Sequence, residues 1–299
     1  MNAKKSWPED TFVWEGKDQE HYCGPHWDPF FDSPDEIFGI LPEAIPDSAP
    51  LTTFGDIYSG PHDIPAGWTK GGHLCWPNAN RGLVATVRVS EDATKLVNVS
   101  PFPPIGMQVG IEIEKVHVWA SGAEAQIEGV WGEAPVSFFD LTFLSNRAWY
   151  EAGQRREFIL AGIAYKAGAP QVDKLALPPD SKLATWQRTH AGLAEGQDAY
   201  VRLEGSSILL PIKDWDRDNY HFRGPVRDVA AFDGWLGQSG WKVRVGVMQF
   251  EDEGADLDVF ITDRAWTSRE PPRVGQDIEG SLWLQGRLWS SPESAQDCL

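Results

Sequence analysis

The chain has 299 residues, of which 26 are basic and 44 acidic, so its net charge is −18 with histidine neutral. This charge opposes a phosphate backbone, which needs Lys and Arg to replace its counterions, and we expect no direct nucleic-acid partner. No apolar run is long enough for a membrane helix, so we expect no membrane span. No apolar run follows the lysines near the N-terminus, so we expect no secretory signal. Three cysteines, an odd number, argue against a disulfide framework and favour a reducing, cytoplasmic location.

Residues 1–81 are rich in Pro, Gly, Asp and aromatic residues and show little regular periodicity. Their aromatic content argues against disorder, because disordered segments have low hydrophobicity. We therefore expect an irregular but ordered N-terminal segment that packs against the rest of the protein. The chain has 15 tryptophans, and most of them are expected in the core of a compact β structure.

Residues 82–168 differ from the N-terminal segment in their more regular alternation of apolar and polar residues, and they are expected to form a first β module. Apolar and polar residues alternate over residues 111–118, which is typical of a strand with one buried face. Residues 157–168 fit either a strand or a short helix, and we favour a strand because a similar segment near the C-terminus is more clearly a strand.

Residues 169–199 combine a linker with a short helix, and Ser181 can cap the start of that helix. A second β module is expected over residues 200–291, and residues 292–299 form a C-terminal tail. Residues 199–212 are expected to form a mostly apolar strand pair at the start of this second module.

The clearest pattern lies in residues 256–289. Residues 256–261 and 278–289 alternate with period two, and we expect two strands there. Pro271 and Pro272 end any regular element between them, because proline fixes φ and lacks an N–H donor. The second of these strands carries glycines on one face, which is typical of the tight bends of a small closed barrel.

A weaker copy of this pattern occurs earlier in the chain. The sequence FLSNRAW at residues 143–149 resembles FITDRAW at residues 260–266, with four identical positions. The Gly-Gln pairs at residues 153–154 and 275–276 follow the two copies after different intervals. We therefore interpret the chain as two related β modules, although alternating strands of any β protein share some likeness.

The layout of residues 222–289, with FRGPVRDV, WKVRVGVMQF, DLDVFI and VGQDIEGSLWLQGRLW as successive strand segments, resembles an OB-fold-like barrel. Residues 137–167 are similar to uncharacterised bacterial proteins with paired modules of this kind. The resemblance implies a mainly β fold with two tandem small OB-like barrels. Many OB-type barrels bind nucleic acids or sugars, but this chain lacks the basic groove that single-stranded DNA requires.

Two cysteines and two histidines in the N-terminal part could form a zinc site: Cys23, His26, His73 and Cys75. A Cys₂His₂ set is a sound tetrahedral zinc site, but the His-x-Cys spacing of the second pair is unusual for one. Buried cysteines also occur simply as small hydrophobic residues, and we favour that interpretation. The sequence thus predicts no cofactor, with zinc as the alternative.

The two modules carry Arg147-Ala-Trp149 and Arg264-Ala-Trp266 at equivalent places in the two copies. Together with Trp283, these residues are candidates for a repeated partner-binding surface. The alternative is an arginine stacked on an aromatic ring of its own module, which contributes about 0.5–1 kcal/mol when exposed.

No catalytic motif of a hydrolase, kinase or nucleotide-binding enzyme occurs in the sequence, and we assign no catalytic residue. The sequence therefore favours a non-enzymatic, acidic binding protein, such as an adaptor, inhibitor or immunity-like protein. We expect its partner to be another protein, one that carries basic charge. The alternatives are a metal-dependent enzyme built on the N-terminal Cys, His and Asp residues, and a carbohydrate-binding module built on tryptophans.

Overall fold

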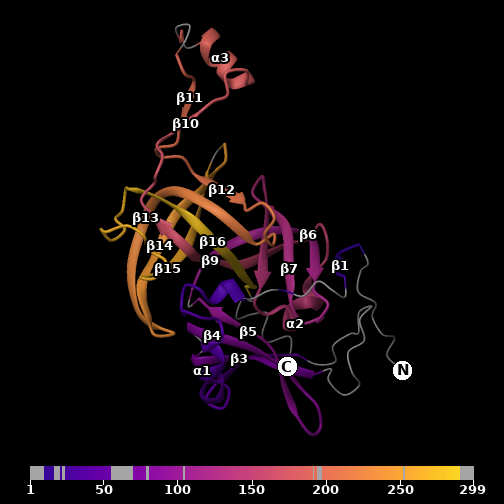
Figure 1. Ribbon diagram of the computed structural model, residues 1–299. Coiled ribbons are helices and arrows are strands. Elements are labelled where there is room, and N and C mark those ends of the chain that lie inside the picture. The colour runs from indigo at the N-terminus through magenta and orange to yellow at the C-terminus, as the bar shows by residue number, and fades with distance from the viewer. Residues whose placement is uncertain are drawn as a thin grey trace.

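Strands dominate the structure, and the expectation of a mainly β protein is confirmed (Figure 1). Among the residues described, no helix combines the length and apolar character needed to span a membrane. The computed structural model describes residues 10–16, 21, 24–54, 70–78, 81–103, 105–190, 192–193, 197–251 and 253–289.

The helices are short, and most of the strands are longer. The helices are η1 (Gly24–Trp27) and η2 (Arg147–Trp149), both 3-10, and α1 (Glu36–Ala44), α2 (Phe143–Asn146) and α3 (Lys182–His190). The strands are β1 (Phe12–Trp14), β2 (Ala49–Phe54), β3 (Lys70–Asn78), β4 (Arg81–Val89), β5 (Thr94–Phe102), β6 (Met107–Val118), β7 (Ala125–Trp131), β8 (Ala134–Asp140), β9 (Arg155–Gly168), β10 (Lys174–Ala176), β11 (Tyr200–Arg202), β12 (Ile208–Pro211), β13 (Asn219–Trp235), β14 (Gln238–Gln249), β15 (Gly254–Thr262) and β16 (Asp277–Leu288).

Ten strands form one large sheet, in the order β1-β6-β7-β8-β16-β9-β15-β14-β13-β12, with additional β6–β9 and β16–β13 pairings. Strands β6, β7, β8, β16 and β9 therefore close one ring of five, and β16, β9, β15, β14 and β13 close a second. Both rings contain the antiparallel pair β9–β16. The sequence predicted modules in tandem, whereas these two rings share a strand pair.

The two halves of the large sheet follow the same pairing pattern. In the first half β6, β7 and β8 pair in succession and β9 returns to β6, as β13, β14, β15 and β16 do in the second half. Ile113 exchanges backbone hydrogen bonds of 2.8 and 3.0 Å with residues 153–154, and Val226 exchanges bonds of 2.9 and 2.8 Å with residues 275–276. Gly153 and Gly275 both have positive φ, 79° and 86°, which glycine adopts without steric cost.

The FLSNRAW and FITDRAW copies do not share a backbone conformation. Phe143 begins the short helix α2, whereas Phe260 lies within strand β15. Likewise, residues 199–212 do not form a strand pair, because β11 pairs with β10 and β12 pairs with β13. Residues 157–168 lie in strand β9, as favoured from the sequence.

The N-terminal part is more regular than expected from its sequence, because its described residues include helix α1 and strands β2 and β3. Strands β2, β3, β4 and β5 pair as a four-stranded antiparallel sheet. Residues 82–102, which the sequence assigned to the first β module, thus pair with N-terminal strands. The indole Nε1 of Trp235 donates a 2.9 Å hydrogen bond to the Gly82 carbonyl, and this joins the small sheet to the large one.

Buried apolar residues form two clusters. One extends through both rings and includes Ile111, Ile127, Phe158, Val243, Leu257 and Leu282. The other lies where the N-terminal part meets the rings and includes Trp27, Phe30, Cys75, Leu83, Trp235 and Trp283. Removal of this apolar surface from water is the main driving force for folding, and it couples the N-terminal part to the large sheet.

Residues 170–206 form a projection that we call the arm, and the remainder of the described chain is the body. The arm contains β10, α3 and β11 and extends away from the body (Figure 1). Its helix begins as the sequence predicted, because the Ser181 hydroxyl oxygen accepts a 3.1 Å hydrogen bond from the Ala184 amide.

Candidate functional site

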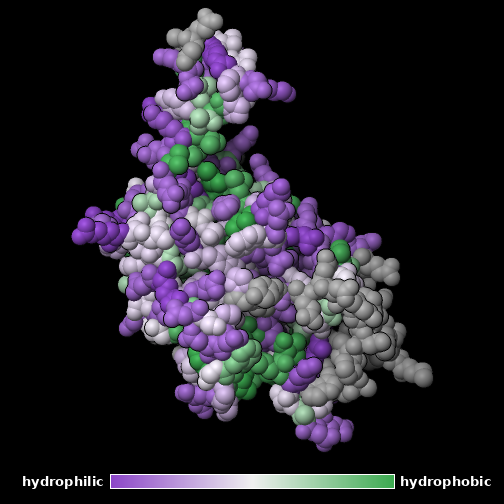
Figure 2. Space-filling view, in the orientation of Figure 1, coloured by the Kyte–Doolittle hydropathy of each residue, from purple (hydrophilic) through white to green (hydrophobic). Residues whose placement is uncertain are grey.

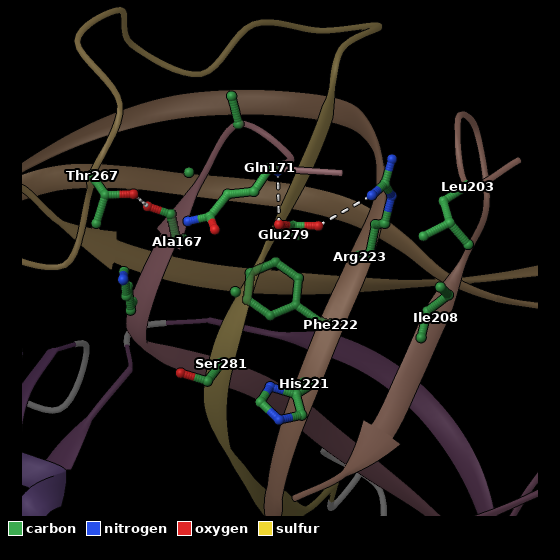
Figure 3. Close-up of a pocket in the computed structure, with 14 residues that line it drawn as sticks. Ala167, Gln171, Leu203, Ile208, His221, Phe222, Arg223, Thr267, Glu279 and Ser281 are labelled. Atoms are coloured by element: carbon green, nitrogen blue, oxygen red, sulfur yellow. Dashed lines mark hydrogen bonds and ion pairs between the residues drawn. The ribbon is translucent and has the colours of Figure 1, made fainter. Parts of the chain in front are cut away.

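A groove of about 450 Å³ lies where the arm joins the body (Figure 3). Its walls come from β9, β12, β13 and β16, from the connections that lead into and out of the arm, and from Thr267 between β15 and β16. This volume falls within the range of ligand pockets, roughly 300–1,000 Å³. The groove is therefore the first candidate for a binding site.

The floor of the groove consists of two rows of residues that run across three strands. One row is Lys166, Ser281 and His221, and the next is Gly168, Glu279 and Arg223. Neighbours in such rows lie about 5 Å apart and project to the same face. A Cβ on Gly168 would lie 2.4 Å from the Thr267 hydroxyl oxygen, so Thr267 occupies the space beside this glycine. Leu203 and Ile208 supply an apolar wall.

Arg223 holds the arm's connections against the body. Its guanidinium Nη1 donates to the Val172 carbonyl at 2.6 Å and to Glu279 Oε2 at 3.1 Å. Nη2 lies 3.7 Å from a carboxylate oxygen of Asp173 and 3.9 Å from one of Asp277. The Arg223 side chain is only 4% exposed, so its guanidinium is largely removed from water, whereas the Asp173 side chain beside it is 79% exposed.

The Glu279 and Asp277 carboxylates also bind the backbone of the same connections. Glu279 Oε1 accepts the Gln171 amide at 2.9 Å, and Asp277 Oδ2 accepts the Gly205 amide at 2.6 Å. The two connections of the arm are thus held by one buried arginine and two carboxylates of β16. These contacts fix the direction in which the arm leaves the body.

The arm buries few of its residues and exposes several large apolar side chains. Among its described residues only Ala184 and Ala199 are buried, whereas Leu175 and Trp186 are each 55% exposed and Leu183 is 44% exposed. Figure 2 shows further apolar side chains at the neck between arm and body. The arm is built from a two-stranded ladder of three residue pairs and a nine-residue helix, and elements of this size have little stability without further packing.

A second concentration of polar groups is buried beside the N-terminal part. His26 packs on Trp283, with ring centroids 3.6 Å apart, and His21 lies 5.0 Å from His26. Asp218 is fully buried and accepts a 3.0 Å hydrogen bond from the Trp283 indole Nε1. Burial raises the pKa of Asp218 to about 6, although the nearby His21 opposes this rise. Burial and then His21 lower the pKa of His26 well below its usual value.

The structure places the expected zinc ligands as follows, except Cys23, which lies outside the described residues. His26 lies in η1 on Trp283, while His73 and Cys75 lie on β3, where His73 Nδ1 is 3.0 Å from the Thr86 hydroxyl. Burial raises the pKa of the Cys75 thiol to about 12, which disfavours a reactive thiolate. Within the part of the chain that the structure describes, no three His, Cys, Asp or Glu side chains are grouped for a metal ion.

The fold does not place the two Arg-Ala-Trp segments in equivalent environments. Arg264 donates to the Phe31 carbonyl at 3.0 Å and to Asp32 Oδ1 at 2.6 Å, so it binds the N-terminal part. Burial lowers the pKa of Arg147 to about 10, and the neighbouring Arg88 acts in the same direction. These two arginines therefore have different environments.

The tryptophans of the same surface also differ. Trp149 is 47% exposed, whereas Trp266 packs against the core and its Nε1 donates to the Glu270 carbonyl at 2.9 Å. Trp283 is 1% exposed, which leaves it no surface to offer a partner.

Arg223, Glu124 and Asp218 were not singled out from the sequence. Asp218 directly precedes β13 and Arg223 lies within it, and the charged residues of DRDNYHFR (216–223) resemble an ordinary solvated turn. Their burial depends on elements far away in the chain, such as the arm connections and Trp283. A pattern of local residues carries no signal for such contacts.

No protein-family model matches the chain, and neither the curated proteins nor the solved structures include one with significant similarity to it.

Proposed function

We propose that the chain is a non-enzymatic binding protein whose partner is another protein, and that the arm and the groove at its base form the contact surface. The observation that carries this proposal is the exposure of Leu175, Leu183 and Trp186 on a projection with almost no core of its own. Tryptophan and leucine at the centre of a contact surface are suited to bury large apolar area in a partner.

The charge distribution supports a partner with basic charge. The arm contains four basic and five acidic residues, so nearly all of the net charge of −18 lies on the rest of the chain. An acidic body beside an apolar arm steers a basic partner by long-range attraction, while the arm supplies the short-range contact. This combination suits an adaptor, an inhibitor or an immunity-like protein.

We further propose that the two rings derive from one duplicated OB-like module. The matched order of strand pairing, and the matched bonds of Ile113 and Val226 to Gly-Gln turns, support this origin. In this proposal the arm is an insertion between the modules that acquired the binding role.

The test is capture of the native partner from the source cells by photo-crosslinking. A photoreactive phenylalanine analogue at position 186 in the arm is compared with one at position 38, because Phe38 is 65% exposed on α1 of the body. We expect position 186 to yield a discrete protein adduct and position 38 to yield none. The variant Leu183→Asp/Trp186→Ala should weaken capture by about tenfold or more.

Equal capture from positions 186 and 38, or capture that the double variant leaves unchanged, would contradict the role of the arm. Turnover of a small substrate, or binding of an oligosaccharide that requires Trp186, would instead support the enzyme or the carbohydrate-binding alternative.

A further inference from the structure

The side chain of His21 is enclosed by body residues that come from separate elements, and it has no exposed area. Two of the enclosing residues lie at the β6–β7 turn, one on β8 and two at the β12–β13 turn. We call this enclosure the cage, and it consists of Trp119, Glu124, Phe139, Asp216 and Asp218.

Two aromatic rings of the cage lie nearly parallel to the His21 ring. The Trp119 ring is 4.3 Å from it at an interplanar angle of 27°, and the Phe139 ring is 5.1 Å from it at 24°. Both body rings therefore present their faces to a flat group. Faces of aromatic rings carry partial negative charge and attract cations, so this geometry fits a planar cation.

The carboxylates of the cage also favour an occupant with positive charge. Glu124 Oε1 lies 3.1 Å from His21 Nδ1, and an Asp216 carboxylate oxygen lies 3.9 Å from Nε2. Asp218 is fully buried, accepts a hydrogen bond from the Trp283 indole, and lies close enough to His21 to interact with it electrostatically. Three carboxylates around one buried place favour an occupant that carries positive charge.

We infer that the cage is a recognition site for a planar cation, a guanidinium or imidazolium group, and that the chain's own His21 is its resident occupant. A guanidinium combines a flat face for Trp119 and Phe139 with an edge of N–H donors for the carboxylates. An arginine side chain of a partner protein, or a small guanidinium compound, has this chemistry and competes with His21 for the same place. This site lies apart from the arm, and the inference does not depend on the proposed function.

The experiment uses the full chain with His21→Ala, which vacates the cage, and His190→Ala as the control. His190 stacks on Trp186 of the exposed arm helix, so removal of its side chain creates no buried cavity. Methylguanidinium, methylammonium and the neutral planar N-methylurea are titrated by calorimetry, with tryptophan fluorescence as a second readout. We expect His21→Ala to bind methylguanidinium about tenfold or more tightly than N-methylurea, and more tightly than methylammonium.

The preference should disappear in His21→Ala/Glu124→Gln, because the carboxylate nearest to the cation is then neutral. Equal affinity for methylguanidinium and N-methylurea, no binding of either, or the same preference in His190→Ala would overturn the inference. If His21→Ala does not fold, His21→Asn is used, and the same ratio of affinities decides.

Two further ligands identify the source of the cation. Tighter binding of a short arginine-containing peptide than of N-acetylarginine amide indicates a protein partner, and equal binding indicates a small guanidinium compound. Both results require the cage and support the inference.

Discussion

Substitution of Arg223 by methionine should release the arm from the body while the rings stay folded. Arg223 donates to Val172 and Glu279 and lies near Asp173 and Asp277, and a methionine of similar length replaces none of these contacts. Breaking a buried ion pair typically costs 3–5 kcal/mol. Asp173 is 79% exposed and Glu279 31% exposed, so water can resolvate them, and we expect a smaller cost of about 2–3 kcal/mol.

The lost free energy should appear as local opening of the arm's connections and not as global unfolding, because the Arg223 contacts join these connections to β13 and β16. The amides of Gln171 and Gly205 donate to Glu279 and Asp277, and hydrogen exchange measured by NMR reports their protection directly. An opening free energy lower by about 2 kcal/mol speeds exchange roughly thirtyfold. Amides of the β14–β15 ladder should exchange at unchanged rates.

Arg227→Met is the matched control, since Arg227 lies on the same strand, is 51% exposed and makes a single 3.8 Å ion pair with Asp256. We expect it to change stability by less than about 0.5 kcal/mol. The reasoning would be refuted if Arg223→Met left the exchange of Gln171 and Gly205 unchanged, or if Arg227→Met accelerated it equally.

Two further predictions concern stability. In Gly224→Ala the new Cβ would lie 1.8 Å from the Gly246 carbonyl oxygen, so β13 and β14 must separate, and denaturant unfolding should show a loss of about 3 kcal/mol or more. Gly39→Ala in α1 meets nothing within 4 Å and should instead stabilise by about 0.5–1 kcal/mol, and a similar loss in both variants would contradict the steric argument. Burial lowers the pKa of His73 to about 3, below its unfolded value, so its contribution to stability is present above about pH 6.5 and is lost as the pH falls towards 3. Between pH 6.5 and 4.5 the stability of His73→Gln relative to the unsubstituted chain should therefore rise by about 2.3 kcal/mol in urea unfolding, and a constant difference would show that His73 is not held neutral.

The sequence alone determined the local features of this protein. Alternation with period two in residues 256–261 and 278–289 requires only neighbouring residues, and both segments are strands. The helix start at Ser181 was predictable for the same reason, because a cap joins residues three apart. Net charge is a sum over residues and needs no structure.

The tertiary structure decided which elements meet. The shared β9–β16 pair, the position of Arg223 beneath the arm and the contact of His21 with Glu124, 103 residues away, all join distant parts of the chain. A strand pattern fixes which face of a strand is buried, but it does not specify the neighbour. The burial that raises the pKa of Asp218 and encloses His21 therefore arises only when three distant parts of the chain pack together. These parts are the N-terminal part, the β6–β7 turn and the β12–β13 turn, and together they exclude water.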